Sequence, residues 1–140
     1  RKNWRNIVDS LNEVLYQYIL SFTKETAHHP LVSKAITVII ANLSNPRFDM
    51  EEMLSDIPLH RDYFRRLFTR ATGMTPLQFL TAKRISYAQQ LLSTRRESGL
   101  SVKEIAFNAG FTDPYYFSRV FKKATGCAPT EWQSTKKLLT

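Results

Sequence analysis

Apolar residues recur at steps of three or four along most of the chain, the spacing that places side chains on one face of an α-helix. Between residues 30 and 43, for example, the stripe consists of Val32, Ala35, Ile36, Ile39, Ile40 and Leu43. No segment shows the sustained alternation of apolar and polar residues that indicates a half-buried β-strand. The pattern therefore predicts an all-α fold.

Start and stop signals divide the pattern into separate helices. Asp49 with Glu52 and Ser101 with Glu104 have the spacing of a capping box at a helix start, and Gly73 is typical of a position just past a helix end. We expect helices over about residues 30–43, 49–57, 60–72, 75–93, 101–110, 112–125 and from 128 through 132. Residues 94–100 are predicted to form a loop between the two halves.

Residues 4–22 carry a separate amphipathic stripe that predicts an N-terminal helix, followed by a polar linker to residue 29. This helix is shorter than three heptads, so it fits either the last helix of an upstream domain or a short dimerisation seam. The chain begins with Arg1 and has no signal-peptide pattern. We therefore expect residues 1–29 to follow a further domain, and residues 30–140 to form the main domain.

The second half of the chain repeats the first. Tyr63-Phe64, Arg66, Phe68, Ala71-Thr72-Gly73 and Pro76 recur 53 residues later as Tyr116-Phe117, Arg119, Phe121, Ala124-Thr125-Gly126 and Pro129. The capping residues upstream are offset by 52 residues, so one residue has been gained or lost where a turn is expected. This repeat predicts two helix-turn-helix subdomains, at about residues 49–72 and 101–125, joined by a long linker helix at about 75–93.

The last helix of each copy has an apolar and a polar face. The residues expected to face the core are Tyr63, Phe64, Leu67, Phe68 and Ala71, and in the second copy Tyr116, Phe117, Val120, Phe121 and Ala124. The opposite faces present Asp62, Arg65, Arg66 and Thr69, and Tyr115, Ser118, Arg119 and Lys122. Burial of the phenylalanines should hold these polar faces outward. The alternative is that the equivalent arginines are clamped to helix carboxylates inside each half.

Charge points to a polyanionic partner. The chain has a formal net charge of +8, and between Ile57 and Arg84 only Asp62 offsets the basic residues. Those residues are Arg61, Arg65, Arg66, Arg70, Lys83 and Arg84. A solvated helix face is the ordinary explanation of such a run, but clustering on repeated helices favours nucleic acid. The planar guanidinium of arginine can pair with both O6 and N7 of guanine.

Signals for other chemistry are weak. His28, His29 and His60 lack a cysteine partner and ligand spacing, so we expect no metal and no other cofactor. Cys127 has no histidine near it in sequence, and we expect no enzymatic activity. The single cysteine fits a reducing compartment, here the cytoplasm. No apolar window is long enough for a membrane span, so we expect no membrane contact.

Residues 101–126, SVKEIAFNAGFTDPYYFSRVFKKATG, closely resemble the second helix-turn-helix of the AraC/XylS family of bacterial transcription regulators. The likeness covers about residues 30–135. It implies a DNA-binding domain attached to a ligand-sensing or dimerising domain in a protein that most often activates transcription. The implied partners are double-stranded promoter DNA, RNA polymerase and, through residues 4–22 or an upstream domain, a second copy.

The resemblance also implies which residues contact DNA. The family's base-reading positions fall on Asp62, Arg65, Arg66, Pro114, Tyr115 and Arg119. The candidates for phosphate contact are Arg61, Thr69, Arg70, Ser118, Lys122 and Lys123. The short capped helix before each reading helix is expected to offer backbone amides to phosphate. The first copy departs from the family pattern at Leu54, Pro58 and His60, where small residues and a serine cap are usual.

The sequence leaves one other class of function open and disfavours a second. A helical interaction module could use the same basic faces to bind an acidic protein. DNA alkyl-transfer repair proteins carry a similar domain, but they need a set of reactive cysteines that this chain does not have.

Overall fold

A computed structural model describes residues 29–132. Its helices are α2 (Pro30–Ala41), α3 (Met50–Ser55), α4 (Arg61–Thr72), α5 (Pro76–Ser93), α6 (Arg95–Ser98), α7 (Val102–Asn108) and α8 (Pro114–Thr125). Residues 129–132 are also helical, and no strand occurs in this range, which confirms the all-α prediction. The predicted helix over residues 4–22 and most of its linker lie outside the described residues.

The prediction of a plain loop over residues 94–100 is wrong, because Arg95–Ser98 forms the short helix α6. The amides of Glu97 and Ser98 donate to the carbonyl of Thr94, which closes one helical turn. Gly99 then ends the turn at a φ of 71°, in the left-handed region that favours glycine. The connection between the two halves is therefore structured through its own backbone hydrogen bonds.

The predicted capping boxes form in the second half and only partly in the first. Ser101 accepts a bond from the Glu104 amide, and the Glu104 carboxylate accepts one from the Ser101 amide, which lowers the pKa of Glu104. Thr75 and Gln78 form the same reciprocal pair at the start of α5. Asp49 accepts from the amides of Glu51 and Glu52, but Glu52 returns no bond to it. The predicted Asp49–Glu52 box is thus only half formed.

The long helix α5 contributes to two separate hydrophobic cores. The first core comprises the buried residues Val32, Ala35, Ile39, Met50, Leu54, Phe64, Phe68 and Leu80. The second comprises Ile85, Ala88, Leu92, Ile105, Ala106, Ala109, Phe111, Phe117 and Phe121. Because Leu80 lies in one core and Ile85 in the other, the helix changes partners within little more than one turn. The two helix-turn-helix units therefore share one helix, α5, which is part of both cores.

The sequence repeat is also a repeat of contacts. The ring of Phe68 packs edge-on against Phe79 with centroids 5.5 Å apart, and Phe121 packs in the same way against Trp132 at 5.8 Å. Phe79 and Trp132 are themselves 53 residues apart, so the aromatic pair is part of the duplicated unit. Each pair joins the second half of α4 or α8 to the helix that follows it.

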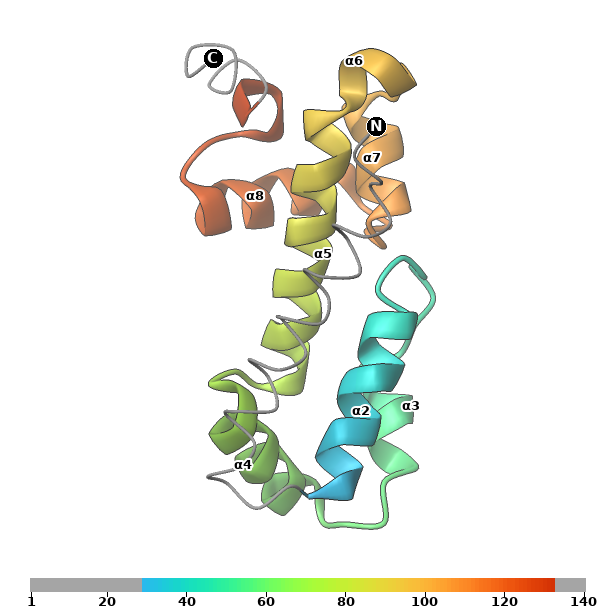
Figure 1. Cartoon of the computed structure of the whole chain (residues 1–140), viewed down its shortest axis with the longest axis vertical. Coiled ribbons are helices and arrows are strands. Elements are labelled where there is room, and N and C mark those ends of the chain that lie inside the picture. Colours follow the sequence, from blue (N-terminus) through green and yellow to red (C-terminus); the bar gives the residue numbers. More distant parts are fainter. Residues whose placement is uncertain (1–28, 133–140) are drawn as a thin grey trace, which may run out of the picture.

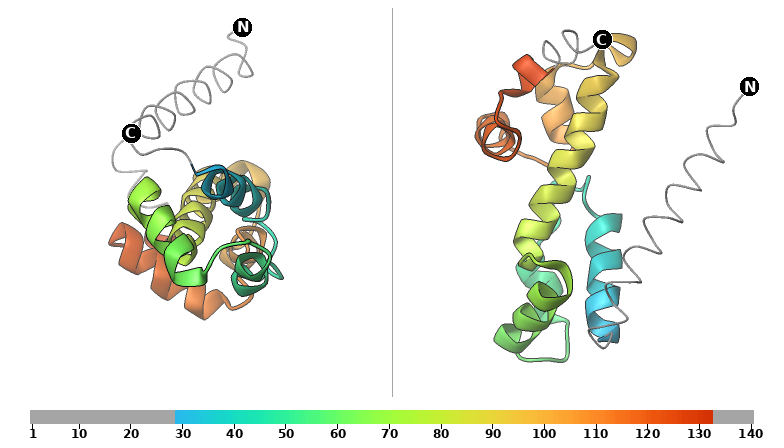
Figure 2. Two further views of the ribbon diagram at one scale, coloured as in Figure 1. Left: turned by 90° about the horizontal axis from the view of Figure 1, so that it is seen from below. Right: turned by 60° about the vertical axis from the view of Figure 1, so that its left-hand side comes forward.

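Figure 1 shows the two units at opposite ends of α5, with α2, α3 and α4 around its lower half and α7 and α8 around its upper half. Helices α4 and α8 lie on the same side of α5 in this view. Seen from below, they run in the same diagonal direction across the molecule (Figure 2, left). The fold thus places equivalent helices of the repeat on one side of the protein.

The buried phenylalanines should dominate the stability of each unit. Phe117, on α8, is fully buried in the second core, so Phe117→Ala is expected to lower the free energy of unfolding by about 3–5 kcal/mol, measured by urea denaturation. Phe107 on the neighbouring α7 is 58% exposed, and Phe107→Ala should change that free energy by no more than about 0.5 kcal/mol. Equal losses in the two variants would contradict this assignment of the core.

Candidate nucleic-acid interface

The rotation of α4 about its axis is fixed by two phenylalanines. Phe64 and Phe68 are 1% and 0% exposed, and their rings lie 6.0 Å apart in the first core. The side chains of Asp62, Arg66 and Thr69 are consequently exposed on the opposite face, as the helical spacing predicts. The polar face of α4 is accessible over the length of the helix.

The equivalent helix of the second copy, α8, is held in the same way by Phe117 and Phe121, both fully buried. Tyr115 is 81% exposed at its first turn, and Arg119 and Lys122 are exposed further along. Ser118 and Pro114 are only partly exposed, and the Ser118 hydroxyl donates to the Pro114 carbonyl at 3.0 Å. The most exposed candidate side chains on the outward face of α8 are therefore those of Tyr115, Arg119 and Lys122.

Three residues expected in the core lie at its edge or outside it. Tyr63 and Tyr116 are 47% and 49% exposed, so the expectation that they point fully inward is wrong in both copies. Each tyrosine lies next to a buried phenylalanine and about 100° around the helix from it, which places its ring at the border of the apolar stripe. Ala124, in the last turn of α8, is exposed rather than buried.

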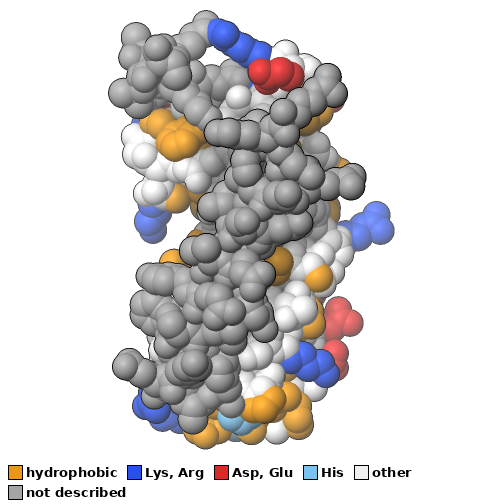
Figure 3. All heavy atoms as spheres, in the orientation of Figure 1, with side chains coloured by type: hydrophobic (Ala, Val, Ile, Leu, Met, Phe, Trp, Pro, Cys, Tyr) orange, Lys and Arg blue, Asp and Glu red, His pale blue; other side chains and the backbone are white. Residues whose placement is uncertain are grey.

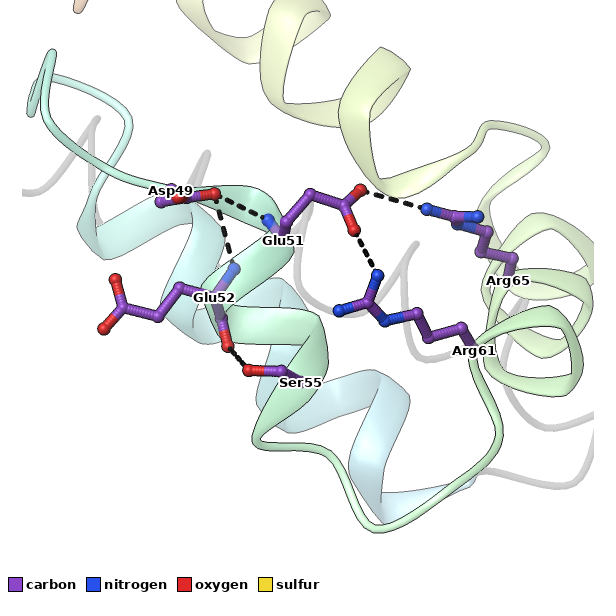
Figure 4. Close-up of polar contacts among 6 residues, drawn as sticks. All are labelled: Asp49, Glu51, Glu52, Ser55, Arg61 and Arg65. Carbon is purple, nitrogen blue, oxygen red and sulfur yellow. Dashed lines mark hydrogen bonds and ion pairs between the residues drawn. The ribbon is translucent and has the colours of Figure 1, made fainter.

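A carboxylate on α3 pairs with two of the candidate arginines on α4. Glu51 accepts a hydrogen bond from Nη1 of Arg61 at 2.8 Å and from Nη2 of Arg65 at 3.1 Å, one to each carboxylate oxygen (Figure 4). All three side chains remain roughly half exposed to solvent. The sequence gives little sign of this bridge, because the partners lie on different helices, 10 and 14 residues apart.

The equivalent arginines of the repeat have different neighbours. Arg66 donates from Nε to the carbonyl of Asp62 on its own helix, at 3.4 Å. The guanidinium of Arg119 lies 6.0 Å from the centre of the Tyr116 ring, a cation–π distance. Neither arginine pairs with a carboxylate among residues 29–132, so the alternative of internal clamping fits Arg61 and Arg65 instead.

The remaining candidates for phosphate contact lie around these faces. Arg61, Thr69, Arg70, Lys122 and Lys123 are all exposed, and Ser118 is partly so. In the space-filling view, Lys and Arg side chains project from the left-hand edge at two levels, just below α8 and at the end that holds α4 (Figure 3). Positive charge thus accompanies both α4 and α8 on one edge of the molecule.

The amides at the start of α3 are poorly suited to phosphate, contrary to the expectation from sequence. The Asp49 carboxylate already accepts from the amides of Glu51 and Glu52, and both glutamates lie in the first turn. Negative side chains at this position occupy the site that a helix N-terminus offers to an anion. In α7, the amide of Glu104 is likewise taken by the Ser101 hydroxyl.

His29 and His60 act as helix caps in this structure. His29 Nδ1 accepts from the Leu31 amide and His60 Nδ1 from the Asp62 amide, each at 3.3 Å. His60 therefore fills the position where the family usually has a serine cap. Within the described part of the chain, no group of three or more His, Cys, Asp or Glu side chains could hold a metal ion, and no helix is long and apolar enough to cross a membrane.

Two helix-turn-helix units on a shared linker helix place the chain in the class of tandem helix-turn-helix proteins. A family model described as a helix-turn-helix domain matches residues 55–135. The chain belongs to this family. Its relatives show that it is a DNA-binding domain of the AraC/XylS type, which in these regulators is C-terminal.

Curated relatives are transcription regulators from several bacteria. The arabinose operon regulatory protein of Salmonella typhimurium is 33% identical over 128 residues, which cover 89% of this chain and 44% of the relative. The regulatory protein YesN of Bacillus subtilis is 38% identical over 105 residues, covering 74% and 28%. The transcriptional activator RhaR of Escherichia coli K12 is 32% identical over 118 residues, covering 84% and 40%. The chain spans less than half the length of each of these relatives.

Solved structures share the arrangement of helices. The C-terminal domain of the response regulator AraT from Geobacillus stearothermophilus has a TM-score of 0.69 and 27% identity, covering 79% of this chain and 88% of that domain. The DNA-binding domain of AdpA, solved in complex with a target DNA, has a TM-score of 0.67 and 29% identity, covering 76% and 93%.

Proposed function

We propose that residues 30–140 form the sequence-specific, double-stranded DNA-binding domain of a bacterial transcription regulator, with α4 and α8 as its two reading helices. The observation that carries this proposal is that equivalent helices of the repeat expose polar, cation-bearing faces on the same side of α5. Membership of the family and the likeness to a domain solved with DNA support it.

The dimensions of the domain support reading of two successive major grooves. Helix α5 has 18 residues and is therefore about 27 Å long. Successive major grooves on one face of B-DNA lie about 34 Å apart. The two scales are close enough for both helices to engage one duplex from a single chain.

The candidates divide by the chemistry of their side chains. Arg65, Arg66 and Arg119 have guanidinium groups able to pair with guanine, and each such contact discriminates between bases by about 1–3 kcal/mol. Tyr115 offers a ring and a hydroxyl, Pro114 an apolar surface for a thymine methyl, and Asp62 an acceptor for cytosine or for a neighbouring arginine. The candidates for phosphate contact position the domain on the duplex and contribute little to sequence choice.

The role in regulation brings further partners into the proposal. RNA polymerase and a second copy of the chain, contacted through residues 4–22 or an upstream domain, are the partners that the family resemblance implies. A cytoplasmic location follows from access to promoter DNA. No enzymatic chemistry is proposed for this domain.

Selection of bound duplexes from a random pool tests the proposed function directly. We expect the recovered sequences to contain two motifs whose centres are separated by about one helical turn of DNA. Competition with unlabelled selected duplex should remove the binding, whereas unrelated duplex at the same concentration should not. Recovery of no common sequence, together with tight binding to an acidic protein, would favour an interaction module instead.

Arg119 and Lys122 on α8 should affect DNA binding in different ways. Arg119→Ala is expected to weaken binding to the selected duplex by about 1–3 kcal/mol and to relax the preference at one base pair. Lys122→Ala should weaken binding to all sequences alike and reduce the slope of log K against log salt by about one unit. Titration of both variants against selected and unrelated duplexes, at several salt concentrations, checks this. Identical profiles for the two variants would contradict the division into base and phosphate contacts.

Glu51 should influence sequence choice through the arginines it holds. Glu51→Gln removes the partner of Arg65, so discrimination between selected and unrelated duplex should fall, by no more than about fivefold because exposed ion pairs are weak. Glu52→Gln is a matched control, since it makes the same charge change on the next residue, whose side chain forms no ion pair with any residue that the structure describes. An equal loss of discrimination in both variants would show that net charge alone is responsible.

A further inference from the structure

Arg84 lies on α5 between the two hydrophobic cores. Its Nε donates to the carbonyl of Leu43 at 2.8 Å, and its Nη2 donates to the carbonyl of Asn45 at 2.9 Å. Both carbonyls belong to the segment that follows α2, in the first unit. The guanidinium therefore ties the middle of the linker helix to the first helix-turn-helix unit over about 40 residues of sequence.

The second unit meets the same guanidinium from the other side. Gly110, in the turn between α7 and α8, has a φ of 91°, and a β-carbon at this position would clash with the Leu43 carbonyl oxygen and fall 2.6 Å from Arg84 Nε. The ring of Phe111, a buried member of the second core, has its centre 6.0 Å from the Arg84 guanidinium. Only glycine leaves room for the two units to approach this closely.

The environment of Arg84 suits a structural contact within the protein better than a contact with DNA. Partial burial lowers the pKa of Arg84, but an arginine keeps its charge at neutral pH. Its two donor atoms already face main-chain acceptors, and hydrogen bonds from a charged donor to such acceptors are stronger than neutral ones. Arg84 is one of the six basic residues between Ile57 and Arg84 whose charge suggests a polyanionic partner, but its hydrogen bonds are made within the protein.

We propose that Arg84 is a positioning residue that fixes the distance and angle between the two reading helices. Each unit has its own core, so the fold of α4 or α8 within its unit does not require the contact. The Arg84 junction, packed against Gly110, adds a second connection beside the continuous backbone of α5. Two connections between the same bodies restrict bending and twisting that a single helix would allow.

A distance measurement tests the junction without DNA. In the full chain carrying Cys127→Ser, spin labels at Ser55→Cys on α3 and Ala124→Cys on α8 report the separation of the two units, and both sites are exposed. We expect one narrow distance distribution for this parent and a broader or shifted one after Arg84→Gln. An unchanged distribution in a variant that keeps its helical circular dichroism overturns the proposal.

Arg95→Gln is the matched control for this experiment. Arg95 also donates from Nε to a main-chain carbonyl, that of Leu100 at 2.9 Å, but both residues lie in the connection before α7 and the bond does not reach the first unit. The variant makes the same charge change and should leave the distance distribution as in the parent. Equal broadening in both variants would overturn the proposal. Arg84→Lys, which keeps the charge and the aliphatic stem, carries the same comparison should the glutamine variant not fold.

A second measurement on DNA rests on the proposed function. With duplexes recovered from the random pool, insertion of one base pair between the two motifs should weaken binding of the parent strongly and binding of Arg84→Gln less. An identical penalty for the parent and the variant contradicts the positioning role. If no duplex is recovered, the proposed function fails while the spin-label result still decides the role of Arg84, so the two failures are distinguishable.

Discussion

The structure depends on one constraint, that a single helix must complete two cores. Leu80 closes the first core and Ile85, Ala88 and Leu92 close the second, so α5 is buried along different faces at its two ends. A small helical unit buries too little apolar surface to be stable without such a shared element. The positions of α4 and α8 are therefore both set by packing against the same helix, α5. The phenylalanine pairs that fix the rotation of each of these helices also fix the direction of its polar face.

The two units are duplicates in their packing but not in their electrostatics. By the offset of 52 residues that relates the helix caps, Lys103 occupies the position of Glu51, and by the offset of 53 Pro114 and Ser118 occupy those of Arg61 and Arg65. The second unit thus lacks all three members of the ion-pair cluster, and its exposed arginine lies over a tyrosine ring instead. The first reading helix carries charge that is partly neutralised within the protein, whereas the second presents its charge without a carboxylate partner in the described range.

Much of the fold could be predicted from sequence, because it follows from local signals. The helical period, the glycine stops and the repeat located each main helix within a few residues, and the spacing of Phe64 and Phe68 gave the buried face of α4. The errors at Tyr63, Tyr116 and Ala124 arise at the margins of the apolar stripes, at the border for the tyrosines and in the last turn of α8 for the alanine, because periodicity does not show how far the core extends. Contacts between Glu51 and α4, and between Arg84 and Leu43, join elements whose approach is set by tertiary packing, so spacing could not reveal them.

Because tertiary contacts are not visible in the sequence, net charge alone says little about which basic residues are available to a partner. The formal charge of +8 counts every arginine alike, yet their surroundings differ. Arg84 and Arg95 bond to main-chain carbonyls inside the fold, and Arg61 and Arg65 share one glutamate. Of the basic residues near the reading helices, Arg66, Arg70, Arg119, Lys122 and Lys123 are exposed and form no ion pair with a described carboxylate. An attraction to polyanions would therefore rest on these side chains, whose positions are fixed by the shared helix, more than on the overall charge of the chain.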